Sequence, residues 1–141
     1  SITVRPEAAG RISAIGFREG QRVTKGETLL QLDPAVNDAE VQQARANLTL
    51  AKSKFDRAVD LAKSNFISGQ ARDEAENNFK VAQAAAALAE AKRAWADGTP
   101  PPLPDEKGDA QKYADRIARL RQTVQLHERN VEALRRELGA R

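Results

Sequence analysis

The chain has 141 residues, of which only 4% are aromatic, so that a thick globular core is not expected. Its 23 basic and 20 acidic residues give a net charge of +3 and are spread along the sequence, a pattern that indicates a mixed solvated surface and speaks against nucleic-acid binding. The absence of cysteine excludes thiolate chemistry and cysteine metal sites, and no apolar run of about 18 residues predicts a membrane span. The absence of methionine indicates a processed or excised chain. The composition favours a thin, elongated helical protein.

Residues 1–33 predict short β elements. Apolar residues alternate with polar ones at 2–4 and 12–17, a second apolar run lies at 29–32, and turns containing glycine separate them. A few short strands need a second sheet or a helix to be stable, so we expect this segment to be completed by strands from elsewhere.

Two long helices are expected, over about 34–65 and 70–95. Asp33 is placed to accept hydrogen bonds from the first free amides, and Pro34 suits a first-turn position that needs no N–H. Apolar residues recur with alternating steps of three and four, as in a coiled coil. The expected seam residues are Val41, Ala44, Leu48, Ala51, Phe55, Ala58 and Ala62 in the first helix, and Ala75, Phe79, Ala82, Ala86 and Ala89 in the second.

The apolar period fails at 65–70, between the two helices. In this segment Gly69 offers a permissive backbone, and the Ser68 side chain is placed to cap the second helix. The sequence therefore predicts an antiparallel helical hairpin over residues 34–96 with an exposed tip at 65–70.

Residues 97–109 and 110–141 are expected to form a proline-rich, semi-rigid linker and a third coiled-coil helix that ends near Gly139. A parallel homodimer of this helix would bring Arg116 opposite Arg121, so packing against the hairpin or a neighbouring subunit is favoured. The expected seam consists of Tyr113, Ile117, Leu120, Val124, His127, Val131, Leu134 and Leu138. Its histidine is the only one in the chain and is interpreted as a half-buried spacer rather than a metal ligand.

No arrangement of residues predicts catalysis. Serines and threonines lack a nearby histidine, the carboxylates are distributed along helix faces, and no glycine-rich phosphate loop is present. We expect neither an enzyme nor a cofactor or metal site.

The string AGRISAIGFREGQRVTKGETLLQLD, residues 9–33, resembles the first half of a biotinyl/lipoyl-type domain. In a carrier domain of this type the modified lysine lies in the turn that joins the two halves. Here the hairpin follows Asp33-Pro34 at that junction, so Lys25 is interpreted as an ordinary exposed charge. The sequence thus predicts a mainly α fold in which a helical hairpin is carried on an incomplete lipoyl-like β segment.

A half-lipoyl motif, an Asp-Pro exit and a heptad hairpin together resemble the periplasmic adaptor, or membrane fusion protein, family of tripartite efflux pumps and type I secretion systems. The resemblance covers residues 1 to about 95. Adaptors that dock onto TolC-type outer-membrane channels carry an arginine, a leucine four residues later and a serine seven residues beyond. Arg57, Leu61 and Ser68 have this spacing, so the resemblance implies that they form a channel-docking site.

The same resemblance implies the partners and the location. Full-length adaptors are anchored at the inner membrane, lie in the periplasm, and assemble into rings that bridge an inner-membrane transporter to the channel. Two alternatives stay open from the residues alone: a structural coiled-coil interaction protein, and a lipoyl or biotinyl carrier with a helical insertion. At the tip, the alternative to docking is that Arg57 pairs with Asp60, Leu61 is a single exposed leucine, and Ser68 is only a helix cap.

Overall fold

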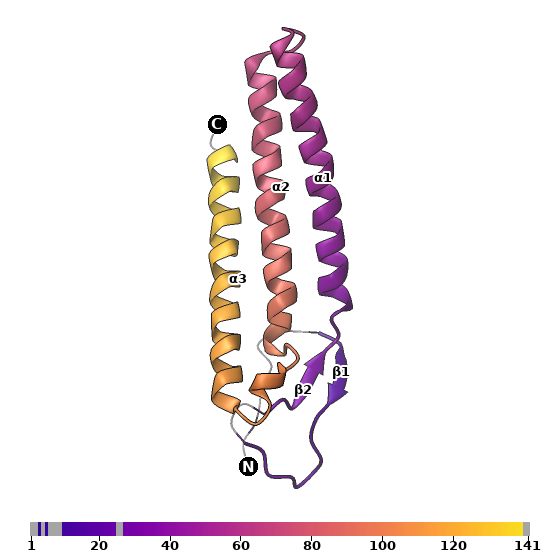
Figure 1. Cartoon of the computed structure of the whole chain (residues 1–141), viewed down its shortest axis with the longest axis vertical. Coiled ribbons are helices and arrows are strands. Elements are labelled where there is room, and N and C mark those ends of the chain that lie inside the picture. The colour runs from indigo at the N-terminus through magenta and orange to yellow at the C-terminus, as the bar shows by residue number, and fades with distance from the viewer. Residues whose placement is uncertain (1–2, 4, 6–9, 25–26, 140–141) are drawn as a thin grey trace.

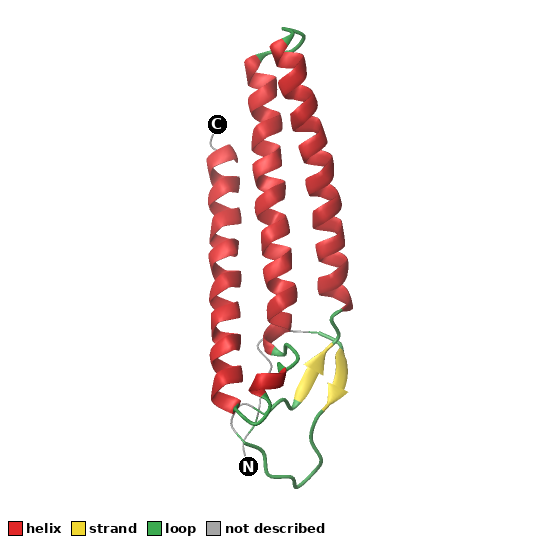
Figure 2. Cartoon of the chain, in the orientation of Figure 1, coloured by secondary structure: helices red, strands yellow, loops and turns green. Residues whose placement is uncertain are grey.

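The computed structural model describes residues 3, 5, 10–24 and 27–139, and three long helices dominate it. The elements are β1 (Ile12–Ile15), β2 (Leu30–Leu32), α1 (Ala35–Lys63), α2 (Gly69–Trp95) and α3 (Ala110–Gly139). The helices lie side by side along the long axis, and the small sheet lies at the end opposite the turn between α1 and α2 (Figures 1 and 2). The predicted fold class is confirmed. None of the helices in these ranges is long and apolar enough to cross a membrane.

The first two helices pack against each other through the predicted seam. Every predicted seam residue of α1 and α2 is buried or half-buried, and Val41 is fully buried at 1% exposure. Near the tip, the rings of Phe55 and Phe79 stack with their centroids 5.7 Å apart and their planes 13° from parallel. These aromatic rings supply contact area that the alanines elsewhere in the seam do not provide.

The third helix packs against α2, so that α2 lies between α1 and α3 (Figure 1). The central helix buries alanines on two sides. Ala86 and Ala89 belong to the α1 seam, and Ala84 and Ala91, seven residues apart, are buried on another face of the helix. All predicted seam residues of α3 are buried or half-buried, including His127. Packing of the third helix against the hairpin, one of the two expected arrangements, is confirmed.

The sheet consists of two antiparallel strands, with Ile12 opposite Leu32 and Ile15 opposite Leu30. Every residue of β1 is exposed, and Ile15 retains 65% of its accessible surface. Ile2 and Val4 of the strand expected at 2–4, and Lys25 and Gly26, lie outside the described residues. The exposed apolar side chains of β1 agree with the expectation that further strands complete this segment, but that expectation stays a prediction. The division of the chain into a lipoyl-like half, a hairpin, a linker and a third helix also stays a prediction.

The linker differs from the expected semi-rigid spacer. Two 3-10 turns, at Ala96–Gly98 and Pro104–Glu106, fold it into a compact corner at the sheet end of the hairpin. Left-handed backbone at Asp97 and Gly98, with φ of 53° and 83°, reverses the chain after α2. Proline content alone favoured an extended segment, but the side chains that follow the prolines bind the linker to α3.

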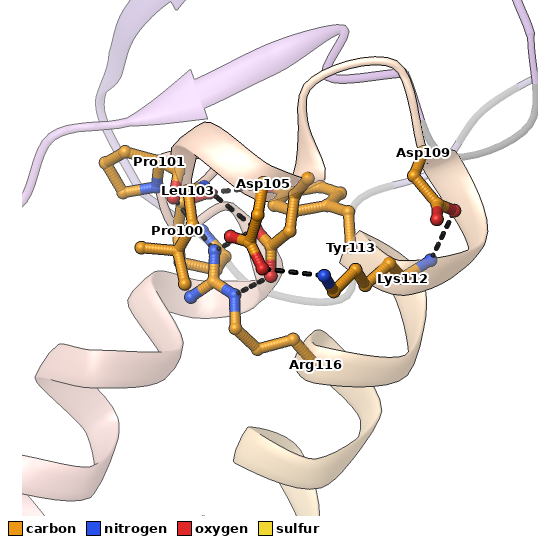
Figure 3. Close-up of polar contacts among 9 residues, drawn as sticks. Pro100, Pro101, Leu103, Asp105, Asp109, Lys112, Tyr113 and Arg116 are labelled. Atoms are coloured by element: carbon orange, nitrogen blue, oxygen red, sulfur yellow. Dashed lines mark hydrogen bonds and ion pairs between the residues drawn. The ribbon is translucent and has the colours of Figure 1, made fainter.

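Two side chains from the first turns of α3 hold this corner (Figure 3). The Tyr113 hydroxyl donates to the carbonyl oxygen of Pro100 at 2.6 Å. The Arg116 guanidinium donates to both carboxylate oxygens of Glu106, at 2.6 and 2.9 Å, and to the carbonyl oxygen of Pro101 at 2.9 Å. These bonds fix where α3 begins, and so they place its seam beside α2.

The Glu106 carboxylate is almost fully buried, with 3% of its side chain exposed, and is saturated with donors. Its hydrogen bond from Arg116 lowers the pKa of this carboxyl despite the opposing effect of burial, and the backbone N–H of Leu103 donates a further bond at 2.9 Å. On the exposed side of the corner, Lys112 pairs with Asp105 at 2.7 Å and lowers the pKa of that carboxyl. A buried carboxylate is tolerated here because its charge and its lone pairs are matched.

Candidate functional site at the hairpin tip

The tip begins with a tight closure of α1. The Asn65 N–H donates to the carbonyl oxygen of Ala62 at 3.1 Å, and the Phe66 N–H donates to that of Leu61 at 2.9 Å, which together form a Schellman motif. Asn65 adopts the left-handed conformation that the motif requires, with φ of 58°. The permissive residue is therefore Asn65 rather than Gly69, which is the first residue of α2 and has no left-handed φ. Asparagine tolerates this conformation better than most residues with a side chain.

The second helix starts from a side-chain cap at Ser68. Its backbone is extended, with φ of −70° and ψ of 158°, and its hydroxyl oxygen accepts the Ala71 N–H at 3.1 Å. The predicted cap is confirmed. The residue is also exposed, so that capping leaves it accessible, and a contact between Ser68 and a partner stays a prediction.

Arg57 and Leu61 lie one turn apart on α1, immediately before the tip. Arg57 is exposed, and within the described part of the chain it forms no ion pair with Asp60, so the alternative of an intrahelical pair is not found. Leu61 is expected to be open to solvent, but in the structure it is half-buried. Its position beside the end of the seam covers part of the side chain, because the two helices meet at the tip.

The most exposed large apolar residue of the described ranges is Phe66, which retains 77% of its accessible surface. The sequence pattern does not identify Phe66 as a site residue, because the heptad pattern fails at 65–70 and Phe66 is not part of either seam. A usable signal was present: an aromatic residue between two helices, outside both apolar stripes, has no predicted partner within the hairpin. Its neighbour Ile67 is half-buried.

Two hollows lie elsewhere on the described part of the molecule. One of about 290 Å³ lies between the sheet and Thr99–Pro102, and another of about 420 Å³ lies between α1 and α2, beside Leu50. Over the ranges that the structure describes, no group of three or more histidine, cysteine, aspartate or glutamate side chains could hold a metal ion. The tip, where a cation, a hydroxyl and an aromatic ring are exposed together, is the candidate site.

Comparison with known proteins identifies the class to which this hairpin belongs. Residues 33–96 match the family described as the RND membrane fusion protein, alpha-helical hairpin domain. The hairpin domain of this chain, residues 33–96, therefore belongs to the RND-type membrane fusion proteins, the adaptor family that the sequence resembles.

The chain is also similar to named proteins over about 70% of its length. The chain is 35% identical to the multidrug resistance protein MdtA of Escherichia fergusonii over 115 residues, which cover 72% of this chain and 28% of the relative. It is 36% identical to the multidrug resistance protein MdtE of Escherichia coli K12 over 112 residues, 70% of this chain and 29% of the relative. The chain thus spans less than a third of the length of these curated relatives. No solved structure gives a significant match.

Proposed function

We propose that this chain is the hairpin-bearing part of an adaptor subunit of a tripartite efflux or secretion system, and that the hairpin tip docks onto a TolC-type outer-membrane channel. The observation that carries the proposal is the exposure of Arg57 and Ser68 at the far end of a hairpin of the membrane fusion protein family. The relatives named above are multidrug resistance proteins, which favours efflux of small molecules as the process served.

The shape of the hairpin suits a docking element. At 1.5 Å per residue, the 27 residues of α2 hold the tip on the order of 40 Å from the sheet. Both ends of the tip turn are closed by hydrogen bonds, so that little conformational freedom is lost when a partner binds. The Arg57 guanidinium, which forms no ion pair with any residue that the structure describes, can bind a carboxylate or a carbonyl oxygen of the channel.

The complete adaptor is proposed to lie in the periplasm, anchored at the inner membrane, and to contact an inner-membrane transporter while several copies form a ring. These features come from the family and concern parts of the protein beyond the hairpin. The tip has its own role in this assembly, because it is the point of the described chain farthest from the sheet (Figure 1).

The proposal is tested by charge reversal at the tip. In the full-length adaptor, Arg57→Asp should weaken binding to a purified TolC-type channel by at least about tenfold. The channel group that accepts hydrogen bonds from the guanidinium would then face the negative charge of the new aspartate. Arg57→Lys keeps the charge and should retain most of the binding. Arg129→Asp, a reversal at an exposed position on α3, is the matched control and should bind like the parent.

Helicity should be unchanged in all three variants, because exposed substitutions of this kind alter stability by about 0.5 kcal/mol or less. Leu61→Asp is a poorer test, because Leu61 is half-buried and a carboxylate there would also disturb the helix pair. Folded Arg57→Asp that binds the channel as tightly as the parent would refute docking through this residue.

A further inference from the structure

We propose that Phe66 is the apolar anchor of the tip, and that its ring inserts into an apolar pocket at the periplasmic end of the channel. This inference rests on the proposed function and deepens it, because it names the residue that supplies the contact area and the chemistry that the partner must offer. The partner surface would be an apolar recess of aromatic size, bordered by an acceptor for Arg57.

Within the part of the chain that the structure describes, Phe66 has no partner that accounts for an aromatic residue at this position. It leaves 77% of its surface in water, and the ring stacking found in the described ranges joins Phe55 and Phe79 instead. Among the described residues, the backbone N–H of Phe66 closes α1, a contribution that any residue except proline could supply. An aromatic side chain that the fold does not use is best explained by a contact made outside it.

The ring is presented on a fixed turn rather than on a loose loop. On one side the left-handed Asn65 and its hydrogen bond to Ala62 hold the backbone, and on the other Ser68 caps α2 through Ala71. Aromatic side chains lose few rotamers on binding, and a fixed backbone reduces the remaining entropic cost. Phe66 is thus placed as a preorganised anchor.

The surroundings of Phe66 match the composition of a binding hot spot. Aromatic residues and arginine are enriched at such positions, and the neutral residues around them exclude water. Here the exposed ring is flanked by Ser64, Asn65 and Ser68, all exposed, and Arg57 lies two turns back on α1. Of the other strongly exposed aliphatic residues of the helices, Leu50 and Leu126 lie along the helical shafts, and Val36 lies in the first turn of α1, at the end opposite the tip.

The experiment compares Phe66→Ala, Phe66→Tyr and Leu126→Ala in the full-length adaptor, using a purified TolC-type channel as the probe. Phe66→Ala should weaken channel binding by about tenfold or more, since truncation of an interface anchor has this effect. Phe66→Tyr keeps the ring and should restore binding to within a few-fold of the parent. Leu126→Ala removes another exposed apolar side chain, 63% exposed on α3, and should bind like the parent. Helical circular dichroism and self-association are measured for each variant.

The outcomes separate this inference from the proposed function. If Phe66→Ala binds like the parent while Arg57→Asp does not, tip docking stands and the anchor assignment is wrong. If both variants bind like the parent, the docking function itself fails. Equal loss in Phe66→Ala and Leu126→Ala, or a change in self-association with unchanged channel binding, would also overturn the assignment, because the ring would then contribute nonspecific adhesion or a contact with a second copy.

Discussion

Packing of α3 against α2 can be tested by replacing two buried valines of α3 with alanine. Val124 and Val131 are 4% and 6% exposed, respectively. Each Val→Ala change removes two methyl groups from the packed face, about 1.6 kcal/mol of transfer free energy. The cavity adds several tenths of a kcal/mol, and the better helix propensity of alanine returns roughly 0.5 kcal/mol. The net loss in the free energy of unfolding should be about 1.5 kcal/mol per site.

The two sites are seven residues apart, about 10 Å along the helix, so their effects should add to about 3 kcal/mol. For a chain of this size that corresponds to a fall in melting temperature of roughly 10 °C. The assay is thermal unfolding followed by circular dichroism at the helical band, with Leu126→Ala as the control at an exposed position of the same helix. If Val124→Ala and Val131→Ala melt like Leu126→Ala, then α3 is not held on α2 by this seam.

Three further predictions concern the corner and the tip. Arg116 lowers the pKa of Glu106 below its ordinary value of 4.5, so the ionised carboxylate stabilises the fold above that pH, and this stabilisation is lost as the pH falls through the lower folded pKa. Melting temperatures measured at stepped acidic pH should therefore fall over this range. Glu106→Gln should reduce the dependence of the melting temperature on pH and should lower stability at neutral pH. Ser68→Ala should cost about 1 kcal/mol through loss of the α2 cap, and Ser68→Asp should restore most of it in urea unfolding; equal stability of all three proteins would contradict the cap. Asn65→Ala should destabilise the hairpin by about 1 kcal/mol and Asn65→Gly should not, because the left-handed backbone penalises a Cβ; the reverse order on thermal melting would contradict the turn geometry.

The helices and their contact faces could be predicted from the sequence because long heptad patterns report burial directly. Val41 and Phe55 on α1, and Val124 on α3, lie where the period of three and four places them. The cap at Ser68 was equally readable, since a serine directly before a helix has one common role. The Arg57, Leu61 and Ser68 spacing identified the end of the hairpin to inspect, while its docking role stays a prediction.

The corner, and the residue that takes the left-handed conformation at the tip, could not be predicted, because both depend on backbone contacts that no apolar periodicity reports. Glu106 and Arg116 are ten residues apart across a proline-rich segment, and only the folded backbone brings the carboxylate under the guanidinium. At the tip, Gly69 was the obvious permissive residue, yet Asn65 takes the left-handed conformation because α1 ends two residues before it. Partial covering of Leu61 likewise follows from the meeting of two helices rather than from its own position in a pattern.

Site-specific cross-linking tests the central proposal most directly, because these 141 residues contain no cysteine and a thiol introduced among them is the only one in this part of the full-length adaptor. Gln70→Cys lies in the first turn of α2 at the tip, and Gln42→Cys lies in the first two turns of α1 near the sheet; both positions are exposed. Each full-length variant, labelled with a short photoactivatable maleimide and mixed with a purified TolC-type channel, is irradiated and probed for adaptor–channel adducts. We expect adducts from Gln70→Cys and not from Gln42→Cys. Adducts from Gln42→Cys alone, or equal yields from both, would contradict docking through the hairpin tip.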